Sequence, residues 1–356
     1  MSDQARELLA QLHAMKLERP LRIINVCGGH ERSISQAGLR QVLPEAIQLI
    51  PGPGCPVCVC PEESIYQAMR YALDDGHIVV AYGDMLRVPI NGPKDGPRSL
   101  EQARAAGGDI RPIASPQQAV TIAQAHPQHK VVFLAAGFET TTAPLAAQVL
   151  QGLPDNLYLL MASRLTWPAV SVLLEQGTSQ VDALIAPGHV AAVMGSEEWR
   201  FICDQHHLPV AVAGFGTESL LGAIRMVATQ ALAGRAELDN AYPEVVRPEG
   251  NVAAQRMLQE VFEVKSAAWR GIGEIPNSGY FLKDRWAAHD AHRQLGLPED
   301  HRQRAGQMPP GCACAEVILA QRLPDQCPLY GKPCTPSSPV GPCMVSDEGA
   351  CHIWWG

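Results

Sequence analysis

Short, continuous apolar runs alternate with amphipathic stretches along the chain, and this pattern limits its possible folds more than any other feature. Each run is apolar along its whole length instead of on alternate residues, as is typical of parallel strands covered on both faces. The stretches between them are patterned as helices, among them 62–73, 99–106 and 115–125. The sequence therefore predicts an α/β protein, wound twice, with parallel sheets. The runs cover residues 21–26, 47–50, 77–82, 131–136, 157–162, 182–186 and 209–214.

The last third of the chain departs from this pattern. A helix is predicted over 250–262 and a loop-like stretch with short strand candidates over 269–286, and about 45 final residues are rich in Cys, Pro and Gly. We therefore expect one α/β domain over 1–135, a second over 136–240, and a smaller, irregular third domain over 241–356.

Charge and hydropathy exclude several functions. The 36 Asp and Glu residues outnumber the 28 Lys and Arg residues, and the net charge is −8. The positive surface on which non-specific nucleic-acid binding depends is therefore missing. No apolar run reaches the roughly 18 residues of a membrane span, and the first residues lack the basic and apolar regions of a signal peptide. We expect a cytoplasmic protein without nucleic-acid or membrane partners.

The loops that follow four predicted strands contain unusual residues. In open parallel sheets, ligands bind where the carboxyl ends of strands meet. These loops are Cys27-Gly-Gly-His30, Pro-Gly-Pro-Gly-Cys55-Pro-Val-Cys58, Gly-Phe-Glu139-Thr-Thr-Thr and Pro-Gly-His189. The sequence predicts that all four share one edge of the molecule.

Eleven cysteines are present, and their distribution is uneven. Because the cytoplasm is reducing, we expect them to serve metal binding, redox chemistry or core packing rather than structural disulfides. Four lie within the first 60 residues and six between Cys312 and Cys351. Two separate cysteine sites are therefore predicted.

Cys27 and His30 place a thiolate and an imidazole on one glycine-rich turn, at the predicted N-terminus of the next helix. A helix N-terminus lowers the pKa of a thiol. Thiolate and imidazole together suit iron, zinc or copper, but two ligands leave most coordination positions open, so a guest or a partner would have to fill them. The alternative is a buried cysteine with a histidine that caps the turn, since free cysteines are commonly buried.

Cys55 and Cys58 are separated by two residues and lie between a predicted strand and a predicted helix. This is the setting of a thioredoxin-like redox pair. The alternative is half of a zinc site, although no second Cys-x-x-Cys follows to complete it. The neighbouring Cys60 is a third thiol whose role the sequence leaves open.

The C-terminal cysteines predict a metal site. Four convergent thiolates suit either tetrahedral zinc or an iron–sulfur cluster. Spacings of 14, 6 and 16 residues separate Cys312, Cys327, Cys334 and Cys351, and they match neither zinc knuckles nor ferredoxin runs. The residues alone leave open both the metal and the choice of four ligands among six. Cys314 and Cys343 are the other two.

Glu139 is the one residue of its loop that a strand-to-helix turn does not explain. Thr142 suits the N-cap and Pro144 the start of a helix, whereas Glu139 is predicted to hydrogen-bond a ligand or to assist proton transfer. His189 is expected to be a turn residue outside the site, and Cys203 to be structural. A bound nucleotide is not predicted, because neither a Walker A sequence nor a spaced glycine fingerprint follows a predicted strand.

Taken together, these motifs resemble the HypD family of hydrogenase maturation proteins from about residue 20 to the end. The resemblance rests on the four loops quoted above, on Trp269-Arg-Gly-Ile-Gly-Glu274, on Cys334-Thr-Pro and on Gly341-Pro-Cys-Met-Val-Ser346. Members of the family commonly have a second histidine shortly after the first, and a threonine after the Cys-x-x-Cys valine. This chain has Glu31-Arg32 and Cys60 there.

The resemblance implies two related α/β domains and a third that carries a 4Fe–4S cluster. It implies that Cys27, with His30 beside it, anchors iron, and that Cys55 and Cys58 are the redox pair. The family's ligand spacing falls on Cys312, Cys327, Cys334 and Cys351, which makes Cys314 and Cys343 spare.

A scaffold function follows from the same resemblance. The chain would hold iron together with HypC, a small chaperone, and accept cyanide from HypE to build the Fe(CN)2CO group of nickel–iron hydrogenases. The dithiol pair and the cluster would supply electrons. In this role the chain is a redox-active scaffold, and whether it turns over as an enzyme stays open. The alternatives are a free-standing iron–sulfur thiol–disulfide oxidoreductase and a zinc-stabilised binding protein.

Overall fold

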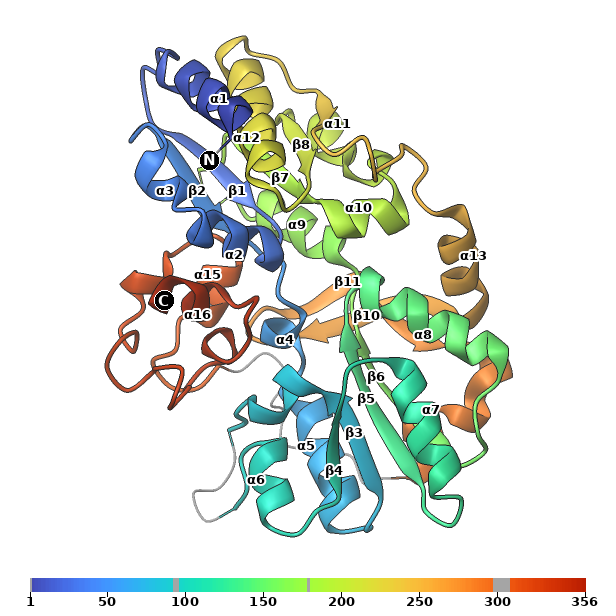
Figure 1. Ribbon diagram of the computed structural model, residues 1–356. Helices are drawn as coiled ribbons and strands as arrows, with labels where there is room; N and C mark the ends of the chain where they lie inside the picture. Colours follow the sequence, from blue (N-terminus) through green and yellow to red (C-terminus); the bar gives the residue numbers. More distant parts are fainter. Residues whose placement is uncertain (1, 92–95, 178–179, 297–307) are drawn as a thin grey trace.

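The computed structural model describes residues 2–91, 96–177, 180–296 and 308–356 (Figure 1). Two parallel sheets form the body of the protein, one in the upper and one in the lower half of the view. An antiparallel hairpin lies between them, and a C-terminal segment rich in turns lies to one side. The predicted α/β class is confirmed.

The first sheet has five parallel strands in the order β2-β1-β7-β8-β9. These strands are β1 (Leu21–Asn25), β2 (Ile47–Pro51), β7 (Ala183–Pro187), β8 (Val210–Ala213) and β9 (Leu238–Asn240). Four of them lie on predicted apolar runs. The exception, β9, is a short edge strand with no apolar run, because its residues are only half-buried.

The second sheet has four parallel strands in the order β4-β3-β5-β6. These strands are β3 (Ile78–Tyr82), β4 (Ile110–Ile113), β5 (Val131–Gly137) and β6 (Leu157–Ser163). Three of them lie on predicted runs, so each of the predicted runs forms a strand. The pattern missed β4, an edge strand of four residues that contains Pro112; proline is tolerated at such an edge.

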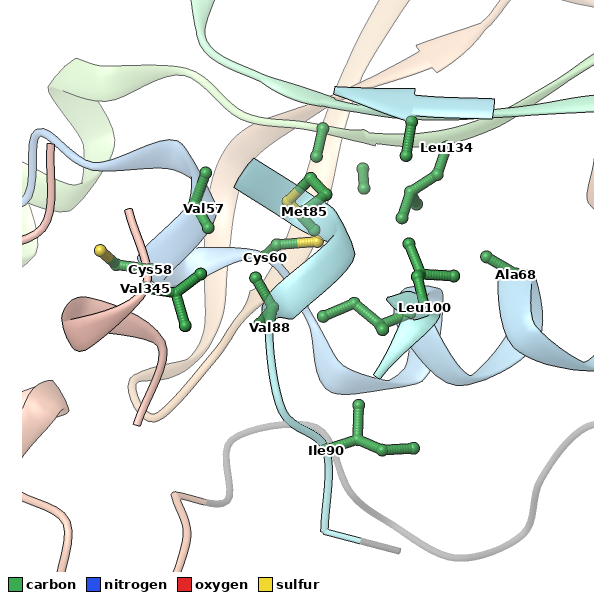
Figure 2. Packing of buried hydrophobic residues seen from close by; sticks show 14 of the residues in the cluster. Val57, Cys58, Cys60, Ala68, Met85, Val88, Ile90, Leu100, Leu134 and Val345 are labelled. Atoms are coloured by element: carbon green, nitrogen blue, oxygen red, sulfur yellow. The ribbon is translucent and has the colours of Figure 1, made fainter. Parts of the chain in front are cut away.

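Both faces of each sheet are covered, which explains the continuous apolar runs. In the first sheet, Ile23 packs into the core on one face and its neighbour Ile24 into the core on the other. In the second sheet, Val132 packs into the core on one face and its neighbour Val131 into the core on the other. Figure 2 shows part of the core on one face of the second sheet, where Leu134 of β5 faces Leu100 and Met85.

The strands of the two sheets are interleaved along the chain. After β2 the chain leaves the first sheet, builds the second one completely, and returns at β7. Residues 1–135 and 136–240 therefore each contribute strands to both sheets, and the sheets do not follow the expected boundaries. Apolar runs show which segments are strands, whereas backbone hydrogen bonds between distant segments decide which strands pair.

The helices flank the sheets and the loops. The predicted helices are present: the three between strands are α5, α6 and α7, and the one over 250–262 is α13. A further helix, α1 (Asp3–His13), precedes β1. Among the described residues, no helix combines the length and apolar character needed to cross a bilayer. The other α-helices are α2 (Gly28–Gln36), α3 (Leu39–Val42), α4 (Pro56–Val59), α8 (Glu139–Gln151), α9 (Thr166–Glu175), α10 (Gly188–Met194), α11 (Phe201–His206), α12 (Thr217–Leu232), α13 (Val252–Val261), α14 (Ala291–Leu295), α15 (Cys314–Ile318) and α16 (Ala350–Trp355), beside α5 (Glu62–Leu73), α6 (Leu100–Ala105) and α7 (Pro116–Ala125). Short 3-10 helices are η1 (Gly83–Arg87), η2 (Glu197–Trp199), η3 (Asp284–His289), η4 (Pro324–Gln326) and η5 (Pro342–Met344).

The region expected to form an irregular third domain is divided in two. Its first part, α13 and the hairpin of β10 (Phe262–Trp269) and β11 (Gly273–Leu282), packs into the core of the second sheet through residues such as Leu258 and Tyr280. The stretch 269–286, expected to be loop-like with short strand candidates, thus contains the whole of β11, a strand of ten residues. The second described part, residues 308–356, is irregular, with two short α-helices among turns.

Candidate functional site

A pocket of about 480 Å³ opens where the carboxyl ends of the two sheets face each other. Loops after strands of both sheets line it, as does a part of the C-terminal segment. The prediction that the motif-bearing loops gather at one edge agrees with this arrangement, because residues from all four loops line the pocket. These residues are Cys27, Gly54, Pro56, Val57, Gly137, Phe138, Thr140, Thr141, Pro187 and His189.

Cys27 caps the N-terminus of α2 and lines this pocket. Burial raises the pKa of its thiol to about 12, although the backbone N–H groups of His30 and Gly29 act in the opposite direction. The expected lowering by the helix N-terminus is therefore outweighed by desolvation. The raised pKa keeps the thiol protonated at neutral pH, and a metal ion would have to displace that proton in order to bind.

His30 belongs to the first turn of α2, and its ring is fully buried. Its Nε2 is 2.9 Å from the carbonyl oxygen of Ala213, and its Nδ1 is 3.2 Å from Oδ1 of Asn25. Burial lowers the pKa of the imidazole to about 4, so the ring is neutral at physiological pH. Both nitrogens face oxygen atoms of the protein, and the ring joins α2 to β1 and β8 rather than pointing at the Cys27 sulfur.

Glu31, one of the two positions that depart from the family pattern, anchors the C-terminal helix. Its carboxylate accepts hydrogen bonds from Arg40 at 2.7 Å and from the Trp354 indole at 2.6 Å. The guanidinium of Arg40 also stacks on the Trp354 ring. This residue therefore holds α16, which carries Cys351, against the helix that carries Cys27.

Cys55 and Cys58 form a disulfide across the first turn of α4. Both residues are buried, with 5% and 0% of their surface exposed. Cys60 takes no part in the pair: its side chain extends toward Met85, while the Cys58 sulfur lies on the opposite side (Figure 2). Burial raises the pKa of the Cys60 thiol to about 11, which makes it unreactive.

Glu139 lies outside the described lining of the pocket. Its two carboxylate oxygens accept hydrogen bonds from the backbone N–H and the hydroxyl of Thr166, at 2.6 and 2.7 Å. Thr166 begins α9, which leads to the first sheet, whereas Glu139 follows a strand of the second. The side chain therefore ties the two halves together, and its neighbours Thr140 and Thr141 line the pocket instead.

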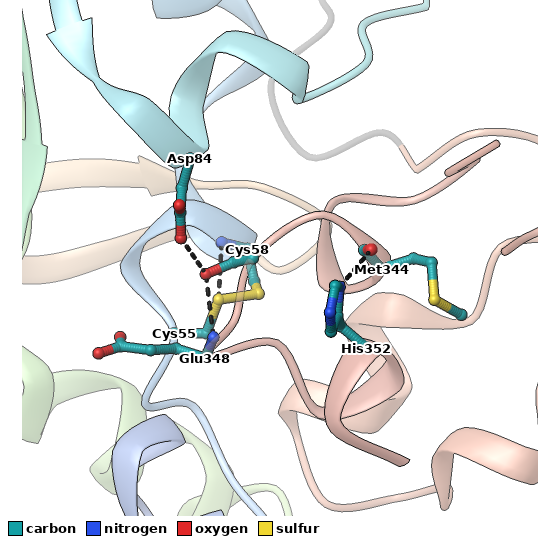
Figure 3. The surroundings of a disulfide bond; sticks show 7 residues. Cys55, Cys58, Asp84, Met344, Glu348 and His352 are labelled. Atoms are coloured by element: carbon teal, nitrogen blue, oxygen red, sulfur yellow. Dashed lines mark hydrogen bonds between the residues drawn. A yellow bond between two sulfur atoms is a disulfide. The ribbon is translucent and has the colours of Figure 1, made fainter. Parts of the chain in front are cut away.

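Sequence reasoning left three polar residues of the pocket out of the site: it did not single out Asp84 or Glu348, and it expected His189 to lie outside, whereas His189 lines the pocket. His189 lines the pocket and packs on the Phe215 ring, with centroids 4.0 Å apart. Asp84 accepts a hydrogen bond from the Ser346 hydroxyl at 2.9 Å, and Glu348 lies close enough to Cys27 to raise the pKa of its thiol. Figure 3 shows Asp84 and Glu348 beside the disulfide. His189 and Asp84 follow strand ends, so the edge rule finds both, but no local signal marks Glu348.

The C-terminal cysteines converge, and three of their sulfur atoms lie within 4.8 Å of one another: those of Cys314, Cys343 and Cys351. Hydrogen bonds from the other two thiols lower the pKa of Cys351, which favours the thiolate form that a metal ligand takes. Cys312 and Cys327 are near enough to influence Cys351 electrostatically. The residues therefore fit a metal or an iron–sulfur cluster.

The ligand set implied by the resemblance and the closest group of sulfurs share only Cys351. A tetrahedral ion with metal–sulfur bonds of about 2.3 Å holds its thiolates about 3.8 Å apart, so the group of Cys314, Cys343 and Cys351 is compact enough for one ion. Cys314 and Cys343, which were expected to be spare, therefore line the same site as the other C-terminal cysteines.

Gly54 lies where the loops after β1 and β2 cross. A Cβ atom there would overlap the carbonyl oxygen of Val26 and lie 2.6 Å from Cα of Cys27. Because backbone has to move, we expect Gly54→Ala to lower the free energy of unfolding by about 3 kcal/mol, measured by urea denaturation. Gly83→Ala is the matched control, since its Cβ meets nothing within 4 Å, and should change stability by less than about 0.5 kcal/mol. Equal effects of the two changes would contradict this account of the crossing.

Fold and site together define a class of protein: an α/β thiol protein in which a Cys-x-x-Cys disulfide lies between a cysteine-lined pocket and a cysteine cluster able to hold metal. Comparison with known families specifies the class further. The HypD family, described as a hydrogenase formation family, matches residues 3–356. The chain belongs to this family.

Curated relatives agree with this assignment. The hydrogenase maturation factor HypD of Escherichia coli is 40% identical over 345 residues, which cover 95% of this chain and 89% of that protein. HypD of Cupriavidus necator is 40% identical over 342 residues, covering 93% and 88%. HypD of Azotobacter vinelandii is 38% identical over 362 residues, covering 99% and 93%. The family resemblance inferred from the motifs is confirmed, and it supports a role in hydrogenase maturation.

Proposed function

We propose that the chain is an assembly scaffold for the Fe(CN)2CO group of nickel–iron hydrogenases, working with a HypC-like small chaperone and a HypE-like cyanide donor. The observation that carries the proposal is a small cavity lined jointly by Cys27, Cys55 and Cys343. A thiol that faces the pocket, a disulfide and the cysteine cluster thus adjoin one another. This proximity suits a protein that holds a metal at one thiol while electrons arrive from the others.

Iron is the cargo of this scaffold, and Cys27 is its anchor on this chain. A single thiolate leaves most coordination positions of the iron open, so a cysteine of the small chaperone supplies a second protein ligand. His30 keeps the Cys27 turn in place through its contacts below α2. Asp84, His189 and Glu348 surround the remaining volume of the pocket, where they are placed to hold water or to accept protons.

Cyanide transfer requires two electrons, and the Cys55–Cys58 pair supplies them. A thiocyanate on the donor plus two electrons and one proton gives a thiol and cyanide. Oxidation of the Cys55–Cys58 dithiol to the disulfide releases two electrons and two protons. The net reaction therefore consumes thiocyanate and dithiol and yields thiol, cyanide, disulfide and one proton. Glu348 is a carboxylate that lines both the pocket and the small cavity, and burial raises its pKa, which favours proton uptake.

The C-terminal cysteines restore the dithiol in this proposal. We assign Cys312, Cys327, Cys334 and Cys351 as ligands of a 4Fe–4S cluster, on the family's spacing. When bound, such a cluster supplies electrons one at a time. The chain contributes proximity: Cys58 and Cys343 belong to one buried core cluster, so the disulfide and the cysteine cluster are in contact through packed side chains.

The test is metal analysis with infrared spectroscopy on anaerobically purified protein, alone and co-expressed with the small chaperone. We expect roughly four irons and four sulfides per chain, as a cubane requires, and CN and CO bands only with the chaperone. Zinc without sulfide would reduce the C-terminal site to a structural one. Disulfide turnover without any partner would favour a free-standing oxidoreductase, which has no use for Cys27.

A further inference from the structure

Arg270 is one of the largest fully buried side chains of the protein, with 1% of its surface exposed. It lies in the turn between β10 and β11. Its backbone N–H donates a hydrogen bond to the carbonyl oxygen of Val59 at 3.0 Å. Since Val59 is the last residue of α4 and follows Cys58 directly, the turn is attached to the helix that carries the disulfide.

The same turn also touches the segment that carries the first two C-terminal cysteines. Gly271 has a φ of +78°, and a Cβ atom there would lie 2.5 Å from Cε of Met308 and 2.8 Å from Cβ of Ala315. No side chain fits at this position, because Met308 and Ala315 lie directly against the backbone. Arg270 is therefore held between the disulfide helix and the stretch that contains Cys312 and Cys314.

The guanidinium of Arg270 is only partly paired. Its Nη2 donates to Oε2 of Glu62 at 3.2 Å and to the carbonyl oxygen of Pro89 at 2.7 Å. Glu62 is itself fully buried and accepts a hydrogen bond from the Asn91 backbone N–H. Within the described part of the chain, Nε and Nη1 of Arg270 are buried and have no acceptor.

Another buried arginine shows that this fold can satisfy such a group. Arg164 is 4% exposed, and its Nε, Nη1 and Nη2 all donate to carbonyl oxygens, those of Ala268 and Ser163. Leaving a buried donor unpaired costs about 1–3 kcal/mol, and Arg270 leaves two. Ala315, whose Cβ meets the backbone of Gly271, follows Cys314 directly, so the turn that carries Arg270 lies against the cysteine segment.

We propose that Arg270 is the positioning residue of the C-terminal metal centre, donating its two unpaired N–H groups to cluster sulfur and stabilising the charge that reduction adds. The inference rests on the proposed function, because it requires a redox-active group at these cysteines. Hydrogen bonds to sulfur and nearby charge are the levers by which a protein sets the potential of an iron–sulfur cluster. Glu62 is the buried counter-charge that limits the effect.

The experiment is an anaerobic redox titration of the purified full-length chain, followed by visible absorbance, with iron and sulfide counted in each variant. Arg270→Gln is combined with Glu62→Gln, since removing one partner of a buried ion pair strands the other. We expect the double variant to retain iron and sulfide but to have a lower midpoint potential. Arg270→Lys keeps the charge, so its midpoint potential should be lowered by less than that of the double variant. Glu62→Gln alone should raise the potential, because it removes a nearby negative charge.

Arg164→Lys is the matched control, because it changes a buried arginine whose N–H groups all bind carbonyl oxygens. Its potential should equal that of the unchanged protein. An unchanged potential in both the double variant and Glu62→Gln, with the cluster intact, would overturn the role of Arg270 and leave the proposed function standing. Absence of any reducible group in the unchanged protein would instead overturn the proposed function, and this role with it. If the double variant does not fold, Arg270→Lys decides, because it keeps the charge opposite Glu62 but removes the guanidinium donors: an unchanged potential in that variant would overturn the role of Arg270.

Discussion

Cys27→Ala is expected to abolish binding of the Fe(CN)2CO group and to leave the C-terminal metal centre intact. Cys27 is the described cysteine whose sulfur faces the large pocket, and alanine offers no ligand for iron. Because the side chain lines a cavity, we expect the free energy of unfolding to change by less than about 1 kcal/mol. Infrared spectra of the variant co-purified with the small chaperone should lack CN and CO bands, while visible absorbance of the cluster persists.

Cys203→Ala is the control for this experiment. Cys203 is a buried thiol of α11, away from the pocket lining, and its removal should leave the infrared bands unchanged. Bands that survive Cys27→Ala at full intensity would show that the iron is anchored elsewhere, and the scaffold proposal would lose its central residue.

Cys351→Ser is expected to have the second large effect, the loss of all metal from the C-terminal segment. Cys351 belongs to both candidate ligand sets, and it is the cysteine of the compact group whose pKa the neighbouring thiols lower. Metal binding at such a site contributes directly to folding. A loss of about 4 kcal/mol corresponds to a fall in Tm of roughly 5 °C for a protein of this size. Metal analysis and a thermal melt of the purified variant measure both effects.

A pair of further variants separates the two ligand sets. Cys327→Ser changes a ligand implied by the family spacing, and Cys343→Ser changes a member of the compact group of sulfurs. We expect Cys327→Ser to lose iron and sulfide and Cys343→Ser to retain them. The reverse result would assign the metal to Cys314, Cys343 and Cys351, and a normal metal content in Cys351→Ser would contradict both sets.

The strands could be located from the sequence, whereas their partners could not. Runs such as 21–26 and 131–136 are apolar throughout because both faces of each sheet are covered, and this is a local property of the chain. Pairing of β1 with β7, more than 150 residues later, depends on hydrogen bonds that no local pattern records. For the same reason β10 was not predicted, β11 was represented only by short strand candidates in a loop-like stretch, and the packing of their hairpin on the second sheet was not foreseen.

The functional site shows the same division between what local sequence reveals and what contacts between distant segments decide. Motif residues identified Cys27, Cys55 and Cys58, and the structure places Cys27 and Cys55 against one cavity. The sequence predicted chemical roles for His30 and Glu139 without knowledge of their hydrogen-bond partners. In the folded chain, carbonyl, amide and hydroxyl groups from distant segments already bind their polar atoms. Likewise the pKa of the Cys27 thiol is raised because burial, a tertiary property, outweighs the helix terminus.

The sequence by itself determined the α/β class and the family and located the cysteine motifs, because these depend on residue type and spacing along the chain. Only the tertiary structure decided the interleaving of the sheets, the entry of Glu348 into the Cys27 pocket and the position of Arg270 between disulfide and cluster. These features arise from contacts between segments far apart in sequence. Burial and hydrogen-bond partners at such contacts are set by the folded chain as a whole.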